Sequence, residues 1–241
     1  MDIIKKLAQE LTIKEEQAKA AVQLIDEGNT IPFIARYRKE MTGALNDETL
    51  RNLHERLLYL RNLEEKKEQV INAITEQGKM TDDLKKKILA AETLVAVDDL
   101  YRPYRPKKQT RATKAKEKGL EPLANILLLQ ATSKSMEEEA QSFVDEAKGV
   151  TNAKEALAGA KDIIAEMIAD KADYRKSIRN CTMKQGRLVV KAKDEKAESV
   201  YEMYYDFSEE LSKITGYRVL AINRGEKEKF LTVKVEAPDA Q

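Results

Sequence analysis

One long stripe of apolar residues at helical spacing constrains this sequence more than any other feature. Between Asn46 and Gln77, large apolar side chains recur at intervals that place them on one side of a helix of about eight turns. The stripe contains Leu50, Leu53, Leu57, Leu60, Val70, Ile71 and Ile74. Glu64 and Lys67 interrupt it midway, so we expect a helix that is packed at both ends and exposed between them.

Other helix signals occur throughout the first three quarters of the chain. Thr12 and Glu15 have the spacing of a capping box, and Gly28 stands where a second helix should end. Gly78 ends the long helix, and Thr81 starts the helix that follows it. With only 9 glycines and no tryptophan, the composition also favours helix over sheet.

The last quarter has a mixed pattern. Residues 186–194 are typical of a strand, and residues 217–237 contain two strand-like runs around 223–228, which predicts a β-hairpin with one solvated face. Residues 197–214 read as a helix, and the spacing of its aromatic residues favours a packed interface over base stacking. These residues are Tyr201, Tyr204, Tyr205 and Phe207. We therefore predict a mainly α, multihelical protein with a long central helix, a helix-turn-helix-like insert and a small β element at the C-terminal end.

The insert is predicted from a short helix, a turn at Gly149 and a long helix that begins after Thr151. Any two antiparallel helices give the same outline. Because the long helix is rich in acidic residues, the segment 173–187 is the better candidate for contact with nucleic acid. Its cations form a possible second patch, with a solvated helix face as the alternative. The patch contains Arg175, Lys176, Arg179 and Lys184.

Composition limits the classes of partner. Of the 241 residues, 42% are hydrophobic and 35% are charged. A chain of this length can bury about 70% of the surface that it exposes when unfolded. The formal net charge is +1, so attraction to nucleic acid must come from local patches. A lone cysteine, Cys181, excludes an intramolecular disulfide and fits a reducing compartment. No run approaches the roughly 20 apolar residues of a membrane span. We expect a cytoplasmic protein with no membrane partner.

Residues 98–123 contain the most uneven distribution of charge. Between Tyr101 and Lys118 the only acid is Glu117, and Pro103 and Pro106 should keep the chain extended with its cations in solvent. Phosphate groups are the obvious partner, and a solvated loop that aids solubility is the alternative. The candidate nucleic-acid-binding residues are Tyr101, Arg102, Tyr104, Arg105, Lys107, Lys108, Arg111 and Lys114.

The residues that catalysis needs are scarce. His54 is the only histidine, and its place on the long helix favours a surface role over that of a base. With Cys181 it supplies two of the three or four ligands that zinc requires, and no glycine-rich phosphate loop occurs. Asp98 and Asp99 could bind magnesium, but arginines three to seven residues later favour ion pairs. We predict a non-catalytic region without cofactor or metal.

Three segments together resemble a known family. Residues 31–71, which begin IPFIARYRKE, residues 97–124, which include LYRPYRPKKQTRATKAKEKGLEPLA, and residues 217–231 are similar to the amino-terminal region of the Tex family of bacterial transcription accessory proteins. The resemblance implies a multihelical region with a helix-turn-helix-like insert. It also implies continuation past Gln241 into a ribonuclease-H-like domain, helix-hairpin-helix elements and an OB-fold RNA-binding domain. The chain departs from the family at Gly216 and Tyr217, where the family usually has Ser-His.

On this basis we expect three parts. Residues 1–124 with 186–214 form the Tex-like helical region, 125–185 form the insert, and 215–241 form a β-hairpin that leads to the ribonuclease-H-like domain. Two functions remain open. In the first, the basic segment contributes to sequence-tolerant binding of RNA or DNA through four to six phosphate contacts. In the second, the same arginines and tyrosines dock onto the C-terminal domains of the same protein or onto RNA polymerase.

Overall fold

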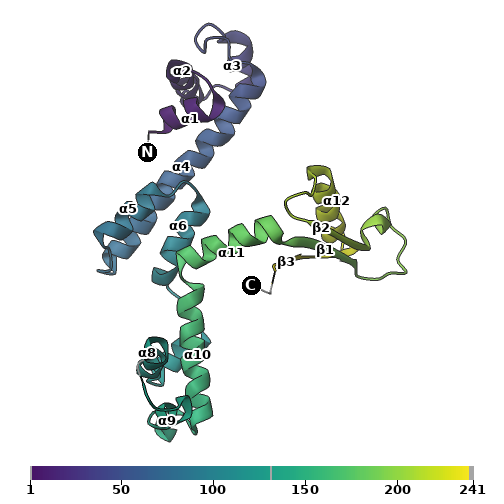
Figure 1. Ribbon diagram of the computed structural model, residues 1–241. Helices are drawn as coiled ribbons and strands as arrows, with labels where there is room; N and C mark the ends of the chain where they lie inside the picture. Colours follow the sequence, from purple (N-terminus) through teal and green to yellow (C-terminus); the bar gives the residue numbers. More distant parts are fainter. Residues whose placement is uncertain (1, 131, 239–241) are drawn as a thin grey trace. The chain divides into compact units, whose positions relative to one another are not determined.

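The computed structural model describes residues 2–130 and 132–238, and within them the mainly helical fold is confirmed. The expected domain ends at residues 1 and 241, and residue 131 of the expected insert, lie outside the described residues. Contacts divide the chain into two compact units, Met1–Pro106 and Lys107–Gln241 (Figure 1). No described helix combines the length and the apolar character needed to cross a lipid bilayer. The domain boundaries expected near residues 124, 185 and 214 stay predictions.

The first unit contains six α-helices among its described residues. They are α1 (Ile3–Leu11), α2 (Glu15–Asp26), α3 (Ile31–Tyr37), α4 (Asp47–Glu76), α5 (Asp82–Ala90) and α6 (Leu94–Tyr101), followed by the 3₁₀ turn η1 (Arg102–Tyr104). The expected capping box at Thr12 is wrong. Thr12 instead ends α1 in the left-handed conformation at φ 56°, and the Gln17 side chain accepts the hydrogen bond from the Lys14 backbone amide at the start of α2.

Helix α4 organises the first unit. The prediction of its bounds is confirmed, with the Asn46 side chain accepting from the Thr49 amide at 2.7 Å. Its first half packs against α1, α2 and α3, and its second half against α5 and α6 (Figure 1). The expected exposed middle is wrong, because Leu63 and Lys67 are buried there. The long stem of Lys67 lets a charged residue continue an apolar stripe.

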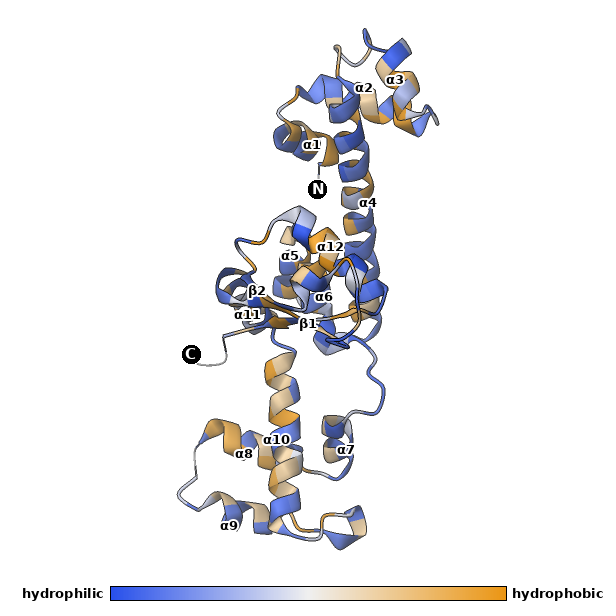
Figure 2. Ribbon diagram, turned by 90° about the vertical axis from the view of Figure 1, so that its right-hand side faces the viewer, coloured by the Kyte–Doolittle hydropathy of each residue, from blue (hydrophilic) through white to orange (hydrophobic). Residues whose placement is uncertain are grey.

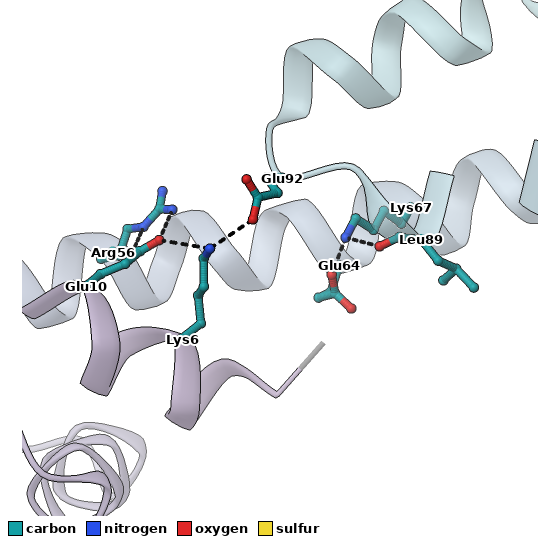
Figure 3. A network of polar contacts seen from close by, with 7 residues as sticks. All are labelled: Lys6, Glu10, Arg56, Glu64, Lys67, Leu89 and Glu92. Carbon is teal, nitrogen blue, oxygen red and sulfur yellow. Dashed lines mark hydrogen bonds and ion pairs between the residues drawn. The ribbon is translucent and has the colours of Figure 1, made fainter. Parts of the chain in front are cut away.

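The buried ammonium of Lys67 joins α4 to α5. It donates to the Glu64 carboxylate and to the Leu89 carbonyl, each at 2.9 Å (Figure 3). The Leu89 carbonyl lies in the last turn of α5, where carbonyls have no partner within the helix. Nearer the start of α4, Arg56 donates two hydrogen bonds to the Glu10 carboxylate of α1, at 2.5 and 2.8 Å (Figure 3). These polar contacts hold the shorter helices in place on α4.

In the second unit, a helical bundle is built around α10. The helices are α7 (Arg111–Glu117), α8 (Glu121–Leu129), α9 (Met136–Gln141), α10 (Ala153–Ala169) and α11 (Ala172–Gln185), with the 3₁₀ turn η2 (Glu146–Lys148) after α9. Figure 2 shows hydrophobic residues along much of α8 and α10. Gly159 lets α10 approach α7 and the start of α8, because a Cβ there would lie 3.2 Å from the Cβ of Ala115 and 2.4 Å from a methyl group of Leu120.

A three-stranded antiparallel sheet completes the second unit. Its strands β1 (Arg187–Ala192), β2 (Asp206–Glu210) and β3 (Leu231–Glu236) have the order β2-β1-β3. The central Val190 pairs with Phe207 on one side and with Val233 on the other. Helix α12 (Gly216–Lys227) packs on β3 and contributes the buried Ile222 to the sheet core.

Two predictions for the last quarter are wrong. Residues 197–214 contain the 3₁₀ turn η3 (Glu202–Tyr204) and strand β2 in place of a helix, and residues 216–227 form α12 in place of the first strand of a hairpin. The partner of β3 is β1, which precedes it by more than thirty residues. A sheet of this size needs a covering element, and α12 supplies it. The predicted packing role of the aromatic residues is confirmed, because Tyr201 and Tyr204 are buried in the sheet core.

Candidate nucleic-acid interface

The predicted basic segment falls into two groups, one in each compact unit. Tyr101, Arg102, Tyr104 and Arg105 belong to the first unit, and Lys107, Lys108, Arg111 and Lys114 belong to the second. The chain is not extended throughout, because Pro103 lies inside the turn η1. Pro is accepted at the start of such a turn, where its missing amide proton is not needed. The extended part begins at Arg105, with φ −65° and ψ 132°.

The tyrosines of the first group anchor the segment to the core of its own unit. Tyr101 and Tyr104 are partly buried against the cluster formed by α4, α5 and α6. The Arg105 guanidinium lies 5.5 Å from the centre of the Tyr101 ring and donates to Asp98 at 2.9 Å. The predicted ion pairing of Asp98 is therefore confirmed. Because the rings are occupied by protein contacts, this group is suited to structure more than to base stacking.

In the second group, two of the four cations face acids of α10 or of the residue that follows it. Lys107 forms ion pairs with Glu166, at 3.4 Å, and with Asp170. Arg111 approaches Asp162 at 3.6 Å, although its side chain is 88% exposed. Lys108 and Lys114 are exposed and form no ion pair with any residue that the structure describes.

The start of α7 is held against α10 by a polar contact. The Thr110 hydroxyl accepts from the Thr113 amide at 3.0 Å and lies 3.0 Å from a carboxylate oxygen of Glu166, to which it donates. A side chain that caps one helix and also binds its neighbour restricts both. The exposed face of α7 therefore has a defined orientation on the bundle.

A shallow groove of about 350 Å³ runs between α7 and α10. Its lining combines cations of α7 with carboxylates of α10. Lys118 donates to the Gly149 carbonyl at 2.7 Å. Hydrogen bonds from the amide and hydroxyl of Thr151, with the charge of Lys118, lower the pKa of Glu155. Because Glu155 and Asp162 line the same groove, their carboxylates lie beside the cations of α7 there.

The possible second patch lies on α11, none of whose residues is buried. Arg175 and Arg179 line a groove of about 330 Å³ with apolar side chains, and Lys176 and Lys184 are exposed elsewhere on the helix. The groove also contains Ile168, Ala169, Tyr174 and Ile178, the last of them 62% exposed. The sequence predicted the cations here but missed the apolar surface between them. Isoleucines at positions 168 and 178, on either side of the turn between α10 and α11, could have indicated it.

The remaining candidate residues belong to different units. His54 is half-buried on α4 in the first unit, whereas Cys181 is half-buried on α11 in the second. Among residues 2–130 and 132–238, no three His, Cys, Asp or Glu side chains gather in a way that could hold a metal ion. Sequence reasoning also missed an exposed aromatic and basic surface at the end of α3, although the run FIARYRK contains the signal.

Comparison with known proteins adds family information. Residues 1–75 match the Tex-like protein N-terminal domain, and residues 131–241 match the Tex central region-like family. Transcriptional accessory protein Tex of Neisseria gonorrhoeae is 41% identical over 239 residues, which are 98% of this chain and 31% of that protein. Protein tex of Bordetella pertussis is 43% identical over 97% of this chain and 30% of its own length.

A human protein also shows clear similarity. S1 RNA-binding domain-containing protein 1 of Homo sapiens is 32% identical over 99% of this chain and 24% of its own length. The chain spans about a third of the length of the bacterial relatives it matches.

Proposed function

Because the chain belongs to the Tex family of transcription accessory proteins, we propose that it is the non-catalytic N-terminal region of such a protein and contributes to sequence-tolerant binding of RNA or DNA. We place its work in the cytoplasm, where bacterial transcription occurs. The name of the human relative refers to an S1 RNA-binding domain, which supports nucleic acid as the partner of the family. We propose that this region assists nucleic-acid binding by other parts of the longer protein.

One observation carries the proposal: α7, which is fixed to the bundle, and the segment just before it present three exposed cations. Lys108 and Lys114 have no acidic partner among the described residues, and Arg111 is 88% exposed. Lys107 is neutralised by two carboxylates and contributes little. About three phosphate contacts remain, fewer than the four to six expected from the sequence. The logarithm of the binding constant should then fall with a slope of about −2 to −3 against the logarithm of the salt concentration.

The test compares two triple variants of the whole chain. In the first, called the α7 variant, Lys108, Arg111 and Lys114 are changed to Gln. In the matched control, three exposed lysines of the first unit that have no ion pair among the described residues are changed to Gln, which removes the same charge. These are Lys79, Lys85 and Lys86.

Affinity is measured by fluorescence anisotropy with mixed-sequence single- and double-stranded DNA and RNA at several salt concentrations. With duplexes, the α7 variant should lose most of the salt slope, and the control should keep it. Equal slopes in the two variants would remove α7 from the mechanism. Comparison of the RNA and DNA arms gives the preferred nucleic acid.

A second candidate function is that of a scaffold. The apolar groove on α11, with Ile178 62% exposed beside Arg175 and Arg179, is of the kind that another protein surface covers. The partner would be the C-terminal part of the same protein or RNA polymerase. A pull-down with the separately produced C-terminal part, and another with purified polymerase, tests this function. An Ile178→Asp variant should lose the association, and absence of association with either partner contradicts it.

A further inference from the structure

We propose that the end of α3 and the turn after it form a separate binding surface for single-stranded nucleic acid. In this surface, Phe33 and Tyr37 stack on bases, while Arg36, Arg38 and Lys39 contact phosphates. The surface lies in the first unit and shares no residue with α7. It goes beyond the function proposed above, because either surface could bind without the other.

The two aromatic rings form an exposed pair. Phe33 and Tyr37 are one helical turn apart, so their side chains lie on the same face of α3. Their ring centres are 5.3 Å apart, with 46° between the ring planes. Tyr37 is 60% exposed and Phe33 is 36% exposed, whereas Tyr101 and Tyr104 are partly buried against their core. Tyr37 therefore offers the more open ring for stacking on an unpaired base, whereas Arg38 lies over one face of Phe33 and leaves its other face for stacking.

The cations beside these rings are not neutralised in the way that Lys107 is. Arg36 and Lys39 are exposed and form no ion pair with the described residues. The Arg38 guanidinium lies 5.0 Å from the centre of the Phe33 ring and donates to the Tyr37 carbonyl at 3.1 Å. Glu40 is the one acid in the run 36–41, which lines an open hollow of about 560 Å³. Three cations against one carboxylate leave the surface positive.

A buried polar contact holds this surface in shape. The fully buried Thr42 donates its hydroxyl to the carbonyls of Arg38 and Lys39, at 3.3 Å each. Gln17 of α2 donates to the carbonyls of Thr42, at 3.2 Å, and Gly43, at 2.9 Å. Ala44 adopts φ 62°, a conformation that costs a residue with a side chain about 1 kcal/mol. A rigid turn lowers the entropy lost when the surface binds a ligand.

The chemistry favours a single strand over a duplex and over an acidic peptide. Bases inside a duplex are already stacked and cannot lie on Phe33 or Tyr37. An acidic peptide would satisfy the arginines and Lys39 but would leave the aromatic faces unused. The surface is open and has no enclosed cavity that would fit a small molecule.

The experiment uses the whole chain and the variant Tyr37→Ala, with Tyr217→Ala as the matched control. Tyr217 is also highly exposed, at 65%, and lies beside an arginine, with the Arg218 guanidinium 5.8 Å from its ring. Circular dichroism first checks that both variants fold. Affinity is then measured for single-stranded DNA and RNA of mixed sequence, for the matching duplexes and for polyglutamate.

Tyr37→Ala should weaken single-strand binding by about 5- to 150-fold and leave duplex binding unchanged, whereas Tyr217→Ala should change neither. Changing Arg36 and Lys39 to Gln should reduce the single-strand salt slope by about 1.4. The proposal is overturned if the wild type does not bind single strands or if Tyr37→Ala binds them normally. It is also overturned if Tyr37→Ala weakens polyglutamate binding as much as single-strand binding. The α7 triple variant, measured in parallel, shows separately whether the proposed function holds.

Discussion

Replacement of Lys67 tests whether a buried charge supports the first unit. Lys67 is only 2% exposed, and its ammonium makes two hydrogen bonds of 2.9 Å, to the Glu64 carboxylate and to the Leu89 carbonyl (Figure 3). We consider two changes. Lys67→Met keeps most of the apolar stem and removes the charge, whereas Lys67→Ala removes both.

The magnitude follows from the contacts that each change removes. Hydrogen bonds to charged groups contribute about 1.5–3 kcal/mol each. The lower part of that range applies here, because the Glu64 side chain is 28% exposed and Leu89 is 51% exposed, so both acceptors regain water. We expect Lys67→Met, which removes both hydrogen bonds, to lower the free energy of unfolding by about 3 kcal/mol. Lys67→Ala loses three more methylene groups, at about 0.8 kcal/mol each, and should cost about 5 kcal/mol.

The assay is urea unfolding of the intact chain, followed by far-ultraviolet circular dichroism. A double-mutant cycle of Lys67→Met with Glu64→Gln should give a coupling energy of about 1–2 kcal/mol. If Lys67→Met and Lys67→Ala both unfold within about 0.5 kcal/mol of the wild type, the ammonium is solvated and the reasoning fails. A coupling energy near zero would assign the loss to Leu89 and the stem alone.

Three further outcomes are expected. Hydrogen bonds from Arg56 lower the pKa of Glu10, so the pair stabilises the fold above the ordinary glutamate value of 4.5 and loses that effect as pH falls; urea unfolding of Glu10→Gln at neutral and acidic pH should show a stability difference that disappears in acid. Lys107→Gln should leave the salt slope of binding unchanged, because this lysine is already paired; a reduced slope in anisotropy titrations would contradict the pairing. Gly225→Ala should destabilise by about 1–3 kcal/mol, since its Cβ would lie 2.6 Å from a buried leucine, whereas Gly216→Ala has open space and should be tolerated in thermal unfolding.

The helices of the first unit could be predicted because their signals are local. Asn46 caps α4 three residues before Thr49, and Gly78 takes a positive φ just after the helix ends. The apolar stripe of α4 is visible in any window of two turns. Lys67 was wrongly expected to be exposed, because the Leu89 carbonyl that accepts its hydrogen bond lies twenty-two residues further along the chain.

The β element could not be predicted with the same success, because strands depend on partners that are distant in sequence. β1 pairs with β2 and with β3, and neither pairing is a tight hairpin. Residues 216–227 have strand-like apolar residues, but they form α12, whose Ile222 is buried in the sheet core. Tertiary packing outweighed the local pattern there.

Local sequence thus determined the helical character of the chain, the bounds of α4 and the position of the basic segment in the chain. Helix caps, apolar spacing and charge can each be recognised within a few residues. Tertiary structure alone decided which of those charges are available. Glu166 of α10 and Asp170 just after it, about sixty residues away, neutralise Lys107, while Lys108 and Lys114 have no acidic partner among the described residues. Tertiary structure also places Tyr101 partly buried against a hydrophobic core, whereas Tyr37 is exposed to solvent. Burial and ion pairing depend on which elements meet in the folded chain, and no short stretch of sequence carries that information.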